Sequence, residues 1–166
     1  MPATLRQGTA ARGSGTAYRG IVTKPRIRTS RFAELEVDRL YDLLRLRVDV
    51  FVVEQACPYP ELDGRDTEPA TEHLWVELDG TVVSTVRILR GDRAWQIGRV
   101  ATARGHRGQG YAAALVRAAI ERIGQQPVEI GAQAHLQGWY ERLGFVRCGP
   151  DYLEDGIAHL PMRREP

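Results

Sequence analysis

The sequence has only two cysteines, Cys57 and Cys148, and it has no long hydrophobic run. A transmembrane helix needs about 20 consecutive apolar residues, so none is predicted. No apolar segment follows Met1, although a secretory signal requires one. Two isolated thiols without an export signal are typical of reduced proteins, and neither cysteine belongs to a Cys-x-x-Cys pair. We therefore expect a cytoplasmic protein with no membrane partner.

Acidic residues are absent from the first 33 positions, which hold seven of the 23 basic residues. Residues 34–166 therefore carry 16 basic and 21 acidic groups, a net charge of −5. Nucleic-acid binders neutralise phosphates with basic groups, so this acidic body argues against a nucleic-acid partner. Residues 1–26 are rich in Gly, Arg and Thr with little to bury, which predicts a disordered extension. Residues 27–166 then form one domain.

Hydrophobic periodicity predicts long helices at residues 37–53 and 110–123 and a short helix at 136–143. Strands are predicted at residues 73–78, 82–89, 95–102, 127–132, 145–148 and 159–163. Asp79-Gly80 is typical of a two-residue hairpin turn, so the early strands are antiparallel. This order predicts an α/β (α+β) domain with a central mixed, mostly antiparallel sheet and helices on both faces.

A glycine-rich segment, residues 104–112, follows a predicted strand and opens a predicted helix. Its glycines permit a sharp turn, and the free N–H groups of a helix start bind phosphate. No Gly-Lys-Ser/Thr follows the glycines, which excludes a P-loop. Gly108, Gly110 and Ala113 also fit the dinucleotide fingerprint. However, only 53 residues follow Ala113, too few for the several βα units of a dinucleotide-binding domain.

Two motifs resemble the GNAT superfamily of N-acetyltransferases. Arg107-x-x-Gly110-x-Ala112 is similar to the family's Arg/Gln-x-x-Gly-x-Gly/Ala motif, and the segment 139–145 is similar to its Tyr-x-x-x-Gly-Phe motif. The chain resembles the ElaA-like branch of this superfamily over about residues 34–163. The similar segments are 46–47, 50–55, 57–59, 63–64, 131–137 and 154–157.

The resemblance implies a single GNAT-like domain that transfers an acetyl group from acetyl-CoA to a primary amine by direct attack. It implies that the strand 95–102 splays from the strand 127–132 and that the acyl chain lies in that gap. Tyr140 then falls at the position of the general acid that protonates the leaving thiolate. The implied contacts to acetyl-CoA come from Val100, Ala101, Thr102, Arg107, Gly108, Gln109, Gly110, Tyr111, Ala112 and Gln133. At the position of Gln133, many members of the family carry Asn.

The acceptor and the general base stay open at this stage. Glu54, His73 and His159 are the acceptor-site candidates. Acidic residues of the segment 54–72 would attract a cationic acceptor, which could be a small amine, a polyamine or a protein amine. No cluster has metal-ligand spacing, so we expect no metal. The alternative function is a CoA-binding regulatory module without turnover, and a homodimer remains open.

Overall fold

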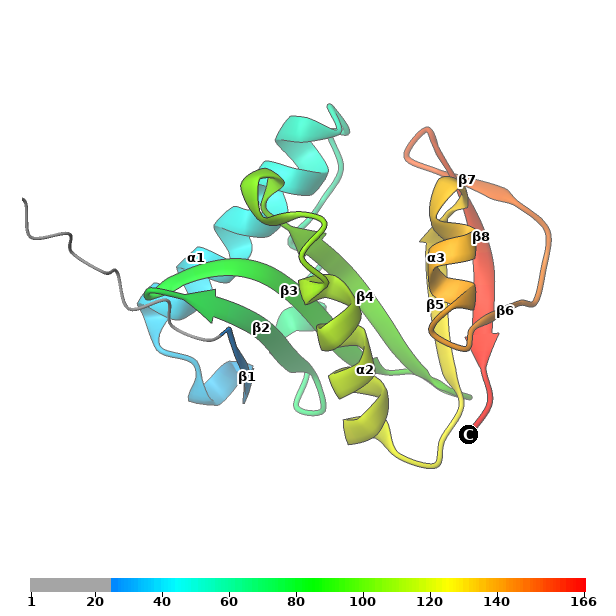
Figure 1. The fold of residues 1–166 in the computed structure, drawn as a ribbon, viewed down its shortest axis with the longest axis horizontal. Helices are drawn as coiled ribbons and strands as arrows, with labels where there is room; N and C mark the ends of the chain where they lie inside the picture. Colours follow the sequence, from blue (N-terminus) through cyan, green and yellow to red (C-terminus); the bar gives the residue numbers. More distant parts are fainter. Residues whose placement is uncertain (1–24) are drawn as a thin grey trace, which may run out of the picture.

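A mixed β-sheet forms the centre of the molecule, with helices packed on both faces (Figure 1). The structure, a computed structural model, describes residues 25–166, and the disorder predicted for residues 1–26 lies outside them except for residues 25 and 26. The strands are β1 (Arg26–Arg31), β2 (Glu72–Leu78), β3 (Thr81–Arg90), β4 (Trp95–Thr102), β5 (Val128–Gln133), β6 (Val146–Arg147), β7 (Tyr152–Glu154) and β8 (Ile157–Arg164). The α-helices are α1 (Val37–Arg47), α2 (Tyr111–Ile123) and α3 (Gln137–Glu141).

The strand order is β1-β2-β3-β4-β5-β8-β6, and β7 pairs with β8. Only β4 and β5 run parallel, whereas the other neighbouring strands are antiparallel. In the β2–β3 turn, Asp79 and Gly80 adopt positive φ angles of 48° and 81°, as an Asp-Gly hairpin requires. The predicted mixed, mostly antiparallel sheet is confirmed. Within residues 25–166, no helix is long and apolar enough to cross a membrane.

Two apolar clusters lie on opposite faces of the sheet, because side chains alternate along each strand. On β2, Leu74 and Val76 belong to the larger cluster, which includes residues of α2 and α3. Trp75, between them, belongs to the smaller cluster with residues of α1. The strand β3 is buried on both faces from Val82 to Leu89, and this buried stretch includes the polar residues Ser84, Thr85 and Arg87. The sheet is therefore covered by α1 on one side and by α2 and α3 on the other.

The first predicted helix changes its geometry near its middle. The chain is α-helical from Val37 to Arg47 and continues as a π-helix from Val48 to Glu54. A π-helix is rare and is frequently found at functional sites. The apolar spacing that predicted a single helix does not distinguish the two geometries.

Two strands escape the sequence pattern. The strand β1 has no fully buried residue and carries Arg26, Arg28 and Arg31, so its composition resembles the basic segment before it. The strand β7 is exposed at all three positions and shows no apolar period either. The sheet therefore begins at Arg26, one residue before the predicted start of the domain.

Three arginines and three carboxylates form a network that we call the charge cluster. Its members are Arg47, Arg87, Arg99, Glu61, Asp63 and Asp66. Asp66 Oδ1 lies 2.7 Å from Arg47 Nη1 and 2.9 Å from Arg87 Nη1. Both guanidinium groups are almost fully buried, with residue exposures of 1% and 3%. Such burial is tolerated because each charge finds an opposite charge and hydrogen bonds.

The cluster neutralises the acidic residues between α1 and β2. Burial favours the neutral acid, but hydrogen bonds from Arg47 and Arg87 hold the pKa of Asp66 below its ordinary value. The pKa of Asp63 is also lowered, since hydrogen bonds from Arg87 and the Arg65 backbone outweigh its partial burial. These carboxylates are thus paired anions. They do not supply the free negative charge that the sequence analysis expects near a cationic acceptor.

Replacing Arg47 by leucine should strongly destabilise the fold, because Glu61 and Asp66 would stay buried without this counter-charge. We expect the free energy of unfolding, measured by urea denaturation, to fall by about 3–5 kcal/mol. Arg45→Leu is the matched control on the same helix, since Arg45 is 56% exposed and pairs with Asp42 at the surface. It should cost no more than about 1 kcal/mol. Equal losses in the two variants would contradict a dominant role for the charge cluster.

Candidate active site

The strands β4 and β5 separate soon after they begin. Their parallel pairing covers only Trp95 with Val128 and Gln96 with Glu129, although β4 continues to Thr102. The splay that the sequence analysis expects between these strands is therefore confirmed. Figure 1 shows the resulting separation between the green strand β4 and the yellow strand β5.

A bulge in β4 faces this gap. In the pairing with β3, Gly98 lies opposite Arg87 and Ala101 lies opposite Thr85. Two residues of β4, Arg99 and Val100, therefore face one residue of β3, and Arg99 adopts a positive φ of 52°. Such a bulge leaves one residue outside the ladder and bends the strand. The bend helps to direct β4 away from β5.

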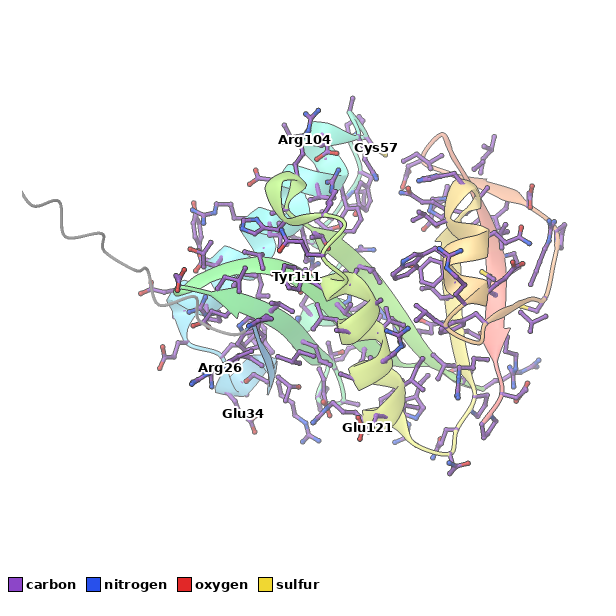
Figure 2. All side chains as sticks on the ribbon, viewed as in Figure 1. Arg26, Glu34, Cys57, Arg104, Tyr111 and Glu121 are labelled. Atoms are coloured by element: carbon purple, nitrogen blue, oxygen red, sulfur yellow. The ribbon has the colours of Figure 1, made fainter. Side chains whose placement is uncertain are left out.

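A cleft of about 870 Å³ lies along the separated strands. Its walls come from β4, β5, β8, α3 and the segment that connects α1 to β2. Val100 and Gln133 lie in its lining near the ends of β4 and β5, and Tyr140 lines it from α3. The cleft is thus formed by elements from both sides of the gap. Figure 2 shows side chains from both sides projecting into the space between β4 and α3.

The glycine-rich segment lies directly after β4. Residues Arg104–His106 form a 3₁₀ turn, and α2 begins at Tyr111 (labelled in Figure 2). Gly108 and Gly110 adopt positive φ angles of 75° and 82°, which glycine accepts without steric cost. A Cβ added at either glycine would meet no heavy atom within 4 Å. The space beside these glycines is therefore open, and the first N–H groups of α2, which have no partner within the helix, are the donors that an anion site uses.

Arg107 joins this segment to the π-helix. Its Nη1 and Nη2 atoms donate to the two carboxylate oxygens of Glu54 at 2.6 and 2.8 Å, and its Nε donates to Thr102 O at 3.0 Å. The hydrogen bonds from Arg107 lower the pKa of Glu54. Glu54 is therefore held by the glycine-rich segment. It does not line the cleft, and its role as an acceptor-site residue stays a prediction.

Tyr140 is anchored on the larger apolar cluster. It is 4% exposed, and its ring packs edge-on against Trp139 and Phe145 with centroid distances of 4.6 and 5.9 Å. Burial raises the pKa of the Tyr140 phenol well above its ordinary range. The side chain therefore presents a protonated hydroxyl at neutral pH, and it lines the cleft.

Two contacts connect the walls across the cleft. The side-chain amides of Gln55 and Gln133 exchange hydrogen bonds at 3.2 and 3.5 Å. The Cys57 thiol donates to the carbonyl oxygen of Asp155 at 3.4 Å. Both contacts link the segment after α1 to the β5–β8 side, so they hold the two sides of the cleft together.

The two candidate histidines have different environments. His159, on β8, lines the cleft, and its Nδ1 lies 2.9 Å from Ile157 O. His73 is 1% exposed, lies beside Asp66 in the charge cluster, and is not part of the cleft lining. Burial is the main cause that lowers the pKa of His73. His73 is thus buried beside the charge cluster and outside the cleft lining, and its role as an acceptor-site residue stays a prediction.

Gln55, Arg99 and Tyr152 are among the lining side chains that the sequence did not indicate as site residues. Arg99 has no motif around it, and its position depends on the bulge in β4. Tyr152 belongs to a strand without an apolar period. Within residues 25–166, no group of three or more His, Cys, Asp or Glu side chains is arranged to hold a metal ion.

The fold and the cleft define an acyl-CoA-dependent N-acyltransferase. The structure aligns with the crystal structure of an acyl-CoA N-acyltransferase from Pseudomonas aeruginosa with a TM-score of 0.81 and 42% identity, over 85% of this chain and 99% of that chain. The chain belongs to the GNAT acetyltransferase family, because residues 40–166 match the model of the acetyltransferase (GNAT) domain.

Two further relatives support the assignment within the family. Protein ElaA of Escherichia coli is 40% identical over 140 residues, which is 80% of this chain and 92% of ElaA. The crystal structure of ElaA gives a TM-score of 0.81 over 86% of this chain and 100% of that chain. A UPF0039 protein of Mycobacterium tuberculosis is 50% identical over 136 residues, 79% of this chain and 87% of its own. The resemblance to the ElaA-like branch is thereby confirmed.

Proposed function

We propose that this enzyme transfers the acetyl group of acetyl-CoA to a primary amine by direct attack. The observation that carries this proposal is the gap between β4 and β5, which ends at the glycine-rich segment and is lined by Tyr140. A thioester in this gap would have an anion site at one end and a proton donor beside it. Acyl transfer from a CoA thioester requires both the anion site and the proton donor beside the separated strands.

The chain offers a matching set of groups for each part of acetyl-CoA. The open N–H groups at Gly108 to Ala112 suit the pyrophosphate, and the free space in front of Gly108 and Gly110 leaves room for it. Val100, Ala101 and Thr102 would align the pantetheine arm through their backbone, opposite Gln133 across the gap. The residue left outside the ladder at the β4 bulge could polarise the thioester carbonyl through its N–H.

Tyr140 is the general acid in this proposal. When the amine nitrogen attacks the thioester carbonyl, the C–N bond forms and the C–S bond then breaks. The phenol donates its proton to the leaving sulfur, and the proton lost by the new amide nitrogen restores the phenol. The position of Tyr140 in the cleft lining supports this role, and its phenol carries the proton to be donated at neutral pH.

A regulatory module that binds CoA without turnover is the competing function. A binding module has no need of a proton donor in the cleft, so the position of Tyr140 favours an enzyme. The two free thiols, Cys57 and Cys148, support the reducing, cytoplasmic location that we also propose.

Release of CoA thiol distinguishes the two functions. Acetyl-CoA is incubated with spermidine, kanamycin, butylamine, a peptide with a free N-terminus and an N-blocked lysine peptide, and free thiol is measured with a chromogenic disulfide. We expect amine-dependent thiol release with at least one of these acceptors. Calorimetric binding of acetyl-CoA without release for any acceptor would favour the regulatory module.

Tyr140→Phe should lower kcat about 100-fold, which is within the usual range for the loss of a general acid. The affinity for acetyl-CoA, measured by calorimetry, should stay unchanged, because phenylalanine preserves the ring contacts with Trp139 and Phe145. Tyr41→Phe, at an exposed position of α1, is the control and should change neither quantity. Unchanged kcat in Tyr140→Phe would remove the general-acid assignment.

Gly110→Val should weaken the binding of CoA about tenfold or more, since contacts to a charged group are each worth about 1.5–3 kcal/mol. Its side chain would fill the space in front of the first N–H groups of α2. Gly80→Val is the matched control, because Gly80 has nearly the same φ and equally open surroundings in the β2–β3 turn. Both variants carry backbone strain, so only a difference in CoA affinity tests the anion site. Equal affinities would refute it.

A further inference from the structure

We propose that His159 is the general base that removes a proton from the acceptor's ammonium group before attack. This inference rests on the proposed acetyl transfer and names a catalytic residue for it. Alkylamines are protonated at neutral pH, and only the neutral amine has the lone pair that attacks a thioester. The cleft must therefore supply a proton acceptor on the side where the amine enters.

His159 lies on the side of the sheet opposite to Tyr140. Along β5, Val128, Ile130 and Ala132 face the larger apolar cluster, which also holds Tyr140. The intervening residues face the other way, and Gln133 of this set pairs with His159 across β5 and β8. Directly opposed residues of paired strands share a face. The base and the acid thus reach the gap from opposite faces, so the amine can enter on one side and the thiol can be protonated on the other.

The hydrogen bond of His159 fixes which ring nitrogen is basic. Nδ1 lies 2.9 Å from the carbonyl oxygen of Ile157. A carbonyl oxygen can only accept, so Nδ1 must carry the proton. In the neutral ring, Nε2 then bears the lone pair and is the atom that accepts the proton.

Tyr152 positions the imidazole. Its ring is stacked on His159 with a centroid distance of 5.8 Å and an interplanar angle of 27°. The Tyr152 hydroxyl lies over β5, where a Cβ at Gly131 would come within 2.5 Å of it. The absence of a side chain at Gly131 therefore lets Tyr152 cover the strand and stack on His159. Tyr152 is a positioning residue in this proposal.

The other acidic and basic groups of the cleft fit this role less well. Asp63 is held by Arg87 and Arg99 in the charge cluster, and Glu129 is held by Arg163 at 2.7 Å. The groups around His159 are Tyr152 and Glu154 on β7, Asp155 in the following turn, and Cys57 and Gln55 from the segment after α1. Glu154 and Asp155 are exposed to solvent.

The proton balance of the reaction follows from these positions. His159 Nε2 takes one proton from the ammonium group and passes it to solvent after the reaction. The neutral amine forms the C–N bond, the C–S bond breaks, and Tyr140 protonates the sulfur. The second proton of the nitrogen returns to Tyr140, so one acetyl-CoA and one ammonium give one amide, one CoA thiol and one solvated proton.

His159→Gln tests the proposal, because glutamine keeps a hydrogen-bond donor but cannot titrate. With the panel amine that wild type acetylates fastest, we expect kcat/KM at pH 7 to fall about 100-fold. The difference in kcat/KM between His159→Gln and wild type should become smaller as the pH is raised to 9, since more of the amine is already neutral in solution. The affinity for acetyl-CoA should not change. His135→Gln is the matched control, because His135 does not line the cleft, and it should keep the wild-type pH profile.

Gly131→Ala supplies a second test that keeps His159 in place. Its methyl group would displace the Tyr152 hydroxyl, which should lower kcat/KM at pH 7, and adding Tyr152→Phe should restore the rate because the obstructing oxygen is gone. An unchanged pH profile in His159→Gln, or no rescue in the Gly131→Ala/Tyr152→Phe double variant, would overturn the proposal. Absence of turnover in wild type with every amine of the panel would instead refute the proposed function itself.

Discussion

The charge cluster determines the shape of the cleft. Its three arginines come from α1, β3 and β4, and its three carboxylates come from the segment between α1 and β2. An isolated buried charge costs several kcal/mol, so the guanidinium groups are compatible with the fold only when that segment is in place. The same segment forms one wall of the cleft. Arg99, which also belongs to the bulge in β4, links this wall directly to the strand along which the thioester would lie.

The crossover from β4 through α2 to β5 brings the remaining parts of the site together. Because only residues 103–110 separate β4 from α2, the first N–H groups of α2 lie near the end of β4 that is not paired with β5. Because β5 leads within four residues into α3, Tyr140 is placed beside the same gap. Packing of α2 and α3 in one apolar cluster fixes both helices relative to the sheet. The site thus follows from the topology, while the chemistry depends on a few side chains.

Sequence reasoning succeeds where a local signal determines a local structure. The Asp79-Gly80 turn, the apolar period of α2 and the glycines before that helix each predict what the structure has at those positions. It fails where the outcome depends on partners distant in the sequence. Nothing near Asp63 indicates that Arg87 and Arg99 neutralise it, and nothing near His73 indicates that it is enclosed by the same cluster. The strands β1 and β7 are missed for a related reason, since edge strands with exposed side chains show no apolar alternation.

The short ladder between β4 and β5 also has a mechanical consequence. The backbone of the two strands is joined only at Trp95–Val128 and Gln96–Glu129, and at the far end the walls are held by the Gln55–Gln133 amide pair and the Cys57 thiol. A change in the angle between the two strands would therefore break few hydrogen bonds between β4 and β5, although the larger apolar cluster spans both walls. The width of the cleft at its far end thus depends on side-chain contacts and not on a backbone ladder.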